Sequence, residues 1–267
     1  MAYRIEHCGN LTLPKPEFVL DENRLFARVF GTGIPTVLIH GNHGSGYTFA
    51  MILPEIMKEF QVILPDMPGF GSGPPMSEFF ENDPLESVAY VEEILKALKI
   101  STAILGGHSL GGLISLLTAL DRPSIVRALV LIDSFVDYHE RPEGLRRFQG
   151  SYPFPHNPNI DAEIGDACDD GKSVNWYNWF DVSGRIQEIH IPVLEMMGEA
   201  NPDTNDLFEK WLIEKRSIVP FNWVTKRILG GAHFIHIEQP EKVLDELLPF
   251  LRSINPYKGS MKCQVIH

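Results

Sequence analysis

Short runs of apolar, β-branched residues alternate along the chain with longer segments in which apolar residues recur with a helical period. This alternation is typical of βαβ units, so we expect an α/β fold with a mostly parallel, doubly wound sheet. Two of the runs are nearly all apolar, as strands covered on both faces must be. The predicted strands are residues 24–30, 35–40, 61–66, 102–107, 127–133, 192–198 and 223–229.

Three segments between or after these strands have the pattern of helices. Residues 85–98 place their apolar side chains on one face, which is typical of an amphipathic helix. Residues 110–120 are apolar all round, so this helix is expected to pack against the centre of the sheet. Residues 241–251 follow Pro240, a residue suited to a first helical turn, and form the expected closing helix.

The segment 134–190 interrupts the alternating pattern, because it is rich in Pro, Gly and Asn and carries an aromatic cluster. It falls between two sheet strands, so we expect it to lie above their carboxyl ends, where open α/β sheets bind ligands. The predicted organisation is a core of residues 1–133 and 191–255, a small inserted cap of residues 134–190, and a flexible tail of residues 256–267. The aromatic cluster of the cap comprises Trp176, Tyr177, Trp179 and Phe180.

The composition excludes several classes of partner. Apolar residues make up 44% and charged residues 22% of the 267-residue chain, which is close to the average for globular proteins. A net charge of −12 argues against nucleic acid or an anionic membrane as partner, because both need clustered Lys and Arg. No apolar run approaches the roughly 18 residues of a spanning helix, and the first residues lack a signal-peptide pattern. We therefore expect a cytoplasmic protein.

No metal or organic cofactor is expected. Cys8, Cys168 and Cys263 are an odd number at wide spacings, which indicates free thiols rather than a disulfide framework or a zinc site. The chain also lacks the H-E-x-x-H motif and a dinucleotide-binding fingerprint.

The strongest chemical signal is Gly107-His108-Ser109-Leu110-Gly111, which follows one predicted strand and opens the apolar helix. It matches G-x-S-x-G in the strand–turn–helix context that the pattern requires. There, small residues let backbone segments meet and leave the serine Oγ exposed above the sheet. Ser109 is therefore the candidate nucleophile. The alternative is a glycine-rich tight turn whose serine only caps the helix.

On these residues the chain resembles the α/β-hydrolase superfamily, from about residue 24 to residue 251. The segment from His40 to Gly46 looks like the family's His-Gly oxyanion loop. The resemblance implies that the backbone amides of Asn42 and Leu110 form the oxyanion hole. A phosphate-binding glycine loop is the alternative for residues 40–46, but the spacing fits neither a P-loop nor a dinucleotide fingerprint. Residues 66–73 also resemble a family segment, and for them we expect a structural role.

The predicted base lies in a loop near the end of the chain. Residues 230–234, Gly-Gly-Ala-His-Phe, follow the last predicted strand and resemble the family's histidine loop. Chain order agrees, because in this fold the histidine comes last. His233 is therefore the predicted base, and His236 is the near competitor. His108, inside the elbow motif, is expected to be a neighbour that shapes the pocket.

The acid is where the chain departs from the family pattern. Relatives usually carry an aspartate after the strand at 192–198, where this chain has Asn201. Some superfamily members, haloalkane dehalogenases among them, carry the acid one strand earlier, and Asp133 occupies the matching position. Asp133 is therefore the predicted acid, with Asp203 and Glu199 as further candidates. An aspartate at such a strand end is also frequent where it only caps a turn.

The resemblance implies a serine hydrolase that cleaves a carboxylic ester, lactone or thioester through an acyl-enzyme. The apolar and aromatic residues of the cap favour an apolar small molecule as substrate. A serine nucleophile argues against epoxide hydrolase or haloalkane dehalogenase activity, which use an aspartate in this family.

Two alternatives stay open, because fold alone does not choose a reaction. One is a carbon–carbon bond hydrolase. The other is a non-hydrolytic, ligand-binding homologue with an impaired triad, for which Asn201 is the support.

Overall fold

The computed structural model describes residues 14–42, 44–75, 83–134, 182–199, 210 and 219–254. The strands of these residues are β1 (Phe18–Glu22), β2 (Leu25–Phe30), β3 (Ile34–Ile39), β4 (Phe60–Pro65), β5 (Ala103–His108), β6 (Val126–Ile132), β7 (Val193–Glu199) and β8 (Trp223–Leu229). The helices are α1 (Leu53–Ile56), α3 (Pro84–Ala97), α4 (Leu110–Asp121), α8 (Ile235–Glu238) and α9 (Pro240–Ser253), with short 3₁₀ helices η1 (Gly46–Phe49), η2 (Pro123–Ile125) and η4 (Ser183–Glu188).

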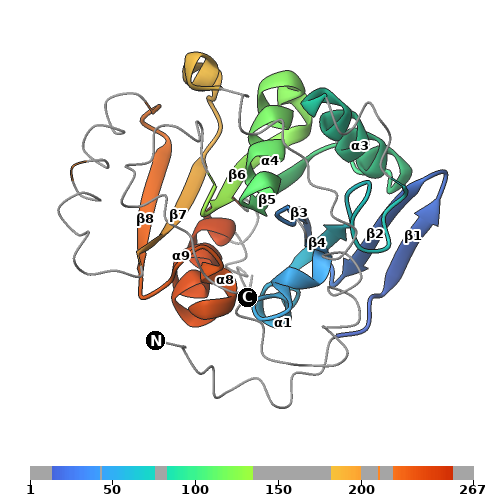
Figure 1. Cartoon of the computed structure of the whole chain (residues 1–267), viewed down its shortest axis with the longest axis horizontal. Helices are drawn as coiled ribbons and strands as arrows, with labels where there is room; N and C mark the ends of the chain where they lie inside the picture. The colour runs from blue at the N-terminus through green and yellow to red at the C-terminus, as the bar shows by residue number, and fades with distance from the viewer. Residues whose placement is uncertain are drawn as a thin grey trace, which may run out of the picture.

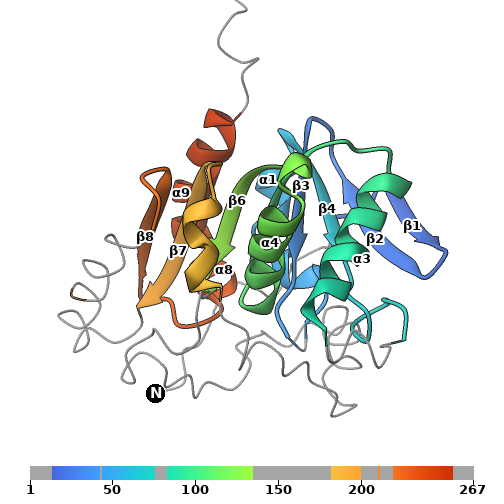
Figure 2. The same ribbon diagram turned by 90° about the horizontal axis from the view of Figure 1, so that it is seen from above.

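The strands form one sheet in the order β1-β2-β4-β3-β5-β6-β7-β8. The pairs β1–β2 and β2–β4 are antiparallel, and every other pair is parallel. The predicted α/β class with a mostly parallel sheet is therefore confirmed. In Figure 2 the arrows of β7 and β8 point in one direction. The loops that follow β3, β5, β6 and β8 thus meet at one edge of the sheet, the carboxyl edge.

Helices cover both faces of the sheet (Figure 1). α3 and α4 pack on one face in an apolar cluster with strand residues such as Leu129, and α1 and α9 pack on the other with residues such as Val130. Consecutive strand residues point to opposite faces, so these two neighbours belong to different clusters. Every residue of α4 from Leu110 to Leu120 is buried, as its all-apolar sequence predicts.

The predicted strands and helices are confirmed to within two residues at each end. The strand β1 was not predicted, because in its sequence FVLDE only Leu20 is buried. Pairing of its backbone with β2 defines it as a strand, and this pairing has no periodic signal in the sequence. The short helices α1 and α8 were missed for the related reason that four residues are too few to show a helical period.

Most of the predicted cap, residues 134–190, lies outside the described residues, as does the predicted tail, residues 256–267, and the domain boundaries stay a prediction. At the end of the cap segment, Val182, Ile186 and Ile189 pack in the apolar cluster of α3 and α4. Within the described ranges, no helix combines the length and the apolar character needed to cross a membrane.

A buried ion pair joins the antiparallel side of the sheet to the loops at its carboxyl edge. Arg28 of β2 donates from Nη1 to Asp66 Oδ2 at 2.9 Å, and the two side chains are 7% and 0% exposed. The Asp66 carboxylate also accepts from Gly46 N at 2.7 Å and from Ser72 N at 2.8 Å. The Arg28 guanidinium lies over the ring of Tyr47, 4.4 Å from its centroid. These contacts agree with the structural role expected for residues 66–73.

We predict that Arg28→Met lowers the free energy of unfolding by about 3–5 kcal/mol, because it leaves the buried Asp66 carboxylate without its counter-charge. Arg252→Met is the matched control, since Arg252 pairs with Glu59 on the surface and is 48% exposed. The control should unfold close to the wild-type urea concentration. Equal midpoints for the two variants in urea unfolding would show that the buried pair does not stabilise the fold.

Candidate active site

Ser109 lies at the turn between β5 and α4 with φ 50° and ψ −116°, a combination that residues with a side chain rarely adopt. Ser109 N donates to Ile132 O at 3.0 Å, and Ser134 Oγ donates to Ser109 O at 2.7 Å. A Cβ at Gly111 would lie 2.0 Å from the carbonyl oxygen of Ile39, so this position requires glycine. Contacts on both sides thus hold a strained serine, half-buried, at the carboxyl edge.

The structure brings His233 and Asp133 together, although they are 100 positions apart. His233 Nδ1 lies 2.6 Å from Asp133 Oδ2. A carboxylate can only accept, so Nδ1 carries the proton and the lone pair of Nε2 is left to act as a base. Asp133 is fully buried, and its other oxygen accepts from Gly198 N at 2.8 Å. A buried carboxylate with two donors is well placed to orient an imidazole and to stabilise it when it becomes charged.

His108 connects the serine turn to the predicted base. Its Nε2 donates to the carbonyl oxygen of His233 at 2.9 Å, and the centroids of the two rings are 4.4 Å apart. His108 directly precedes Ser109, so the ring of His233 packs, tilted by 52°, against a side chain of the serine turn. Burial lowers the pKa of His108 well below its ordinary value, which keeps this neighbour uncharged.

The competitor His236 is not placed as the base. It is fully buried, and neither of its ring nitrogens has a hydrogen-bond partner within the described residues. Burial lowers its pKa to about 3. Its ring packs instead against Phe49 and His108, with centroids 5.2 Å and 4.7 Å away.

The loop that carries His233 is fixed by its own neighbours. Ala232 N donates to the carboxylate of Glu238, whose pKa is raised by burial. A Cβ at Gly198 would lie 1.8 Å from the Ala232 carbonyl oxygen, so the loop crosses the end of β7 only because residue 198 is glycine. The sequence hypotheses did not include Gly198. Its position at the end of β7, between the strand that precedes Asp133 and the strand that precedes His233, is the signal that could have found it.

The two predicted oxyanion amides come from segments that meet at Ser109. A Cβ at Gly41 would lie 3.3 Å from Ser109 Cβ, so the peptide between Gly41 and Asn42 passes next to the serine. Leu110 is the first residue of α4, and its amide is one of the helix N–H groups that have no acceptor within the helix. Their role in holding an oxyanion stays a prediction.

The side chains of the other residues in the acid hypothesis are not among those that the structure describes. Asn201 and Asp203 lie outside the described residues, as does the side chain of Glu199. The aromatic cluster of the cap and the three cysteines lie outside them as well. In the part of the chain that is described, no group of three or more His, Cys, Asp or Glu side chains is arranged to hold a metal ion.

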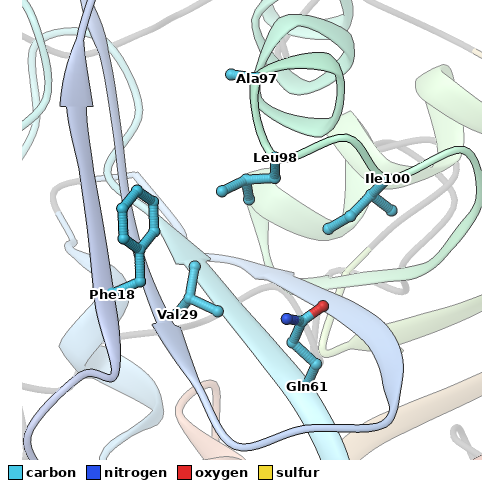
Figure 3. Close-up of a pocket in the computed structure, with 6 residues that line it drawn as sticks. All are labelled: Phe18, Val29, Gln61, Ala97, Leu98 and Ile100. Carbon is cyan, nitrogen blue, oxygen red and sulfur yellow. The ribbon is translucent and has the colours of Figure 1, made fainter.

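A pocket of about 320 Å³ has none of these residues in its lining. Figure 3 shows the six residues that line it. Gln61, near the amino end of β4, and the residues at the end of α3 contribute to its wall, so it opens at the edge of the sheet opposite to Ser109. Its lining is Phe18, Val29, Gln61, Ala97, Leu98 and Ile100. With one polar side chain and no titratable group, it has no means of catalysis, and it is not the candidate site.

The geometry agrees with comparisons to known proteins. Residues 35–155 match the model of the family described as alpha/beta hydrolase fold. The chain is similar in structure to a thermophilic esterase from Thermogutta terrifontis, with a TM-score of 0.68 and 21% identity over 86% of this chain and 93% of that one. It is similarly close to the meta-cleavage product hydrolase from Pseudomonas fluorescens IP01, with a TM-score of 0.66 and 21% identity over 86% of this chain and 96% of that one. The predicted fold and the resemblance to the α/β-hydrolase superfamily are therefore confirmed.

Sequence similarity to a curated relative covers about half of the chain. The chain is 38% identical over 128 residues to the 2-hydroxymuconate semialdehyde hydrolase of Pseudomonas sp. strain CF600. This match covers 46% of the chain and 44% of that relative, so it spans less than half of either protein.

We predict that Gly111→Ala lowers the free energy of unfolding by about 3 kcal/mol or more, because the new methyl group would meet backbone rather than a side chain that can move. Gly184→Ala is the matched control, since a Cβ there has nothing within 4 Å. That variant should stay within about 0.5 kcal/mol of the wild type in urea unfolding. A Gly111→Ala protein as stable as Gly184→Ala would contradict the tight approach of α4 to β3.

Proposed function

We propose that this chain, which has the α/β-hydrolase fold, is a serine hydrolase with Ser109 as nucleophile, His233 as base and Asp133 as acid. The observation that carries the proposal is the 2.6 Å contact of His233 Nδ1 with Asp133 Oδ2, which orients the imidazole beside the serine turn. If the acid were Glu199 or Asp203 instead, His233 Nδ1 would have to leave Asp133 in order to bind it. The strained backbone of Ser109 adds weight, because such strain gathers at functional sites.

In the proposed reaction, Ser109 Oγ attacks the acyl carbon of the substrate while His233 Nε2 takes its proton. The amides of Asn42 and Leu110 donate to the oxygen that becomes negative, and fixed donors of this kind are each worth about 2.7–4 kcal/mol. His233 then protonates the leaving group, and the acyl group stays on Ser109. Water, activated by His233, releases the acid and restores the hydroxyl.

The proposed substrate is a carboxylic ester, lactone or thioester of an apolar small molecule. The structural likeness to an esterase is consistent with this class. The preference for an apolar guest comes from the cap sequence, which lies outside the described residues, and it stays a prediction. The cytoplasmic location and the absence of nucleic-acid or membrane partners also stay predictions.

A carbon–carbon bond hydrolase is the second candidate function. The similarity to a 2-hydroxymuconate semialdehyde hydrolase favours it, at 38% identity over 128 residues. The same serine, histidine and oxyanion amides would serve both reactions, since each passes through attack on a carbonyl carbon. Turnover of 2-hydroxymuconate semialdehyde that exceeds turnover of every p-nitrophenyl ester would favour this second function.

The nucleophile is tested with a fluorophosphonate probe and a series of p-nitrophenyl esters of graded chain length. We expect wild-type protein to be labelled and to hydrolyse the shorter esters. Ser109→Ala should lose labelling, with kcat falling on the order of 10⁴- to 10⁶-fold. Ser253→Ala is the control, because Ser253 is exposed at the end of α9 and its Oγ donates to the carbonyl of Phe250 in the same helix. It should be labelled and active like the wild type. Folded wild-type protein that neither reacts with the probe nor turns over any substrate would favour the non-hydrolytic ligand-binding homologue.

The acid is tested by comparing Asp133→Asn with Asp203→Asn. The two oxygens of Asp133 accept from two donors, Gly198 N and His233 Nδ1, whereas an asparagine at 133 has one accepting oxygen and no negative charge. With its NH2 group facing Nδ1 it favours the wrong tautomer of the imidazole, and kcat should fall about 10⁴-fold. Asp203→Asn should leave kcat within a few-fold of wild type. The assignment is wrong if the ranking is reversed while circular dichroism shows both variants folded.

A further inference from the structure

The imidazole of His40 has a defined tautomer. His40 follows β3 directly, is 1% exposed, and has a partner at each ring nitrogen. Nδ1 lies 2.7 Å from the carbonyl oxygen of Gly41, and Nε2 lies 3.0 Å from the backbone nitrogen of Met67. A carbonyl oxygen can only accept and a backbone N–H can only donate. The ring is therefore neutral, with its proton on Nδ1.

The carbonyl that His40 holds belongs to the peptide that carries the candidate oxyanion donor. The oxygen of Gly41 and the N–H of Asn42 lie in one planar trans peptide and point in opposite directions. A hydrogen bond that fixes the oxygen therefore aims the N–H. The same bond polarises the peptide, which makes its N–H a stronger donor. Gly44 N also donates to this oxygen, at 3.2 Å, so the His40 contact is the shorter of two.

The position of this peptide matches such a role. Gly41 lies next to both Ser109 and His108. A Cβ at Gly41 would lie 2.7 Å from His108 Nδ1 and 3.3 Å from Ser109 Cβ. A side chain at residue 41 would therefore displace the loop from the nucleophile. Glycine lets the peptide approach, and a glycine-containing loop needs an added restraint because glycine has the most backbone freedom to lose.

The far end of the loop is held separately. Gly46 N donates to Asp66 Oδ1 at 2.7 Å, and Met67, whose amide binds His40, is the next residue along. The loop after β3 is thus tied to the segment after β4 at its first residue, through His40, and at Gly46. Only the first of these ties also contacts the peptide of the candidate donor.

We propose that His40 is a positioning residue for the oxyanion hole: its Nδ1–H holds the Gly41 carbonyl and so aims the Asn42 amide at the developing oxyanion. This inference rests on the proposed function, since it assigns a role within that site. His40 touches no reacting atom, and its effect passes through the Gly41–Asn42 peptide.

The surroundings keep the ring in the required neutral form. Burial lowers the pKa of His40 below its ordinary value and is the largest effect. The nearby Asp66 carboxylate opposes it by raising this pKa, and Arg28 adds to it. His108 faces the same region from β5 and is itself neutral because it is buried. A protonated His40 could not accept from Met67 N, so the hydrogen-bond pattern and the electrostatics require the same state.

Two substitutions separate the two bonds of the ring. In His40→Asn the side-chain amide lies as far from Cβ as Nδ1 does, so it can still donate to Gly41 O but cannot reach Met67 N. In His40→Gln the terminal amide reaches the position of Nε2, so it can accept from Met67 N but no longer holds Gly41 O. Each variant loses one hydrogen bond, which makes them matched controls for each other.

The experiment measures kcat and KM for a p-nitrophenyl ester and inhibition by a trifluoromethyl ketone, which forms an oxyanion when a serine adds to it. We expect His40→Gln to lose about 10- to 100-fold in kcat with KM nearly unchanged, and to bind the ketone more weakly by a similar factor. His40→Asn should keep kcat and ketone binding within a few-fold of wild type. A role limited to holding the two loops together predicts the opposite order, and that order, or equal losses in folded variants, would overturn the proposal.

A second measurement does not depend on activity. In ¹⁵N-histidine-labelled protein, with the His40 signals assigned by their loss in His40→Gln, we expect a proton on Nδ1 and none on Nε2 at pH 7. The Asn42 amide resonance should shift more in His40→Gln than in His40→Asn. A proton on Nε2, or equal Asn42 shifts, would reject the positioning role even if the protein proves inactive on esters. Absence of labelling and turnover in wild type would reject the proposed function alone.

Discussion

The hydrogen bond from His233 to Asp133 constrains the whole carboxyl edge of the sheet. Asp133 directly follows β6 and His233 follows β8, so the histidine loop must cross the end of the intervening strand β7. Gly198 allows that crossing in two ways: it has no side chain to block Ala232, and its amide donates to Asp133. A buried carboxylate without partners is costly, so the same contacts that orient the imidazole also stabilise the fold. Here the geometry of the site and the stability of the sheet edge depend on one set of bonds.

Neutral histidines lie at the same edge of the sheet as the candidate base. His40, His108 and His236 are all buried, and burial lowers the pKa of each. Because they stay uncharged, they do not repel the charge that His233 gains in the proposed reaction. His40 and His108 form directed hydrogen bonds, whereas the ring of His236 packs against Phe49 and His108. A protein interior that orients dipoles before the substrate arrives needs no rearrangement at the moment of reaction. The buried pair of Arg28 and Asp66 contributes in the same way, since its carboxylate accepts backbone amides from two loops at this edge.

The fold was largely accessible from the sequence because its elements have strong local patterns. The apolar strands β6 and β7 and the apolar helix α4 are long enough to show their period, and each is buried as expected. The edge strand β1 was not accessible, since backbone pairing with β2 defines it rather than burial of its side chains. The serine turn was accessible for a different reason: its glycines and its position between a strand and a helix are properties of consecutive residues.

The sequence by itself determined the parallel sheet, the serine turn and the two loops expected to face it, because each of these depends on residues that are neighbours in the chain. It left the acid open among Asp133, Asp203 and Glu199, since nothing in the chain order measures a distance to His233. Tertiary structure decided that Asp133 contacts the imidazole, and it also decided the proton positions on His40 and His108. Those outcomes depend on which groups from different strands come within about 3 Å of one another, and only the packed sheet determines such distances.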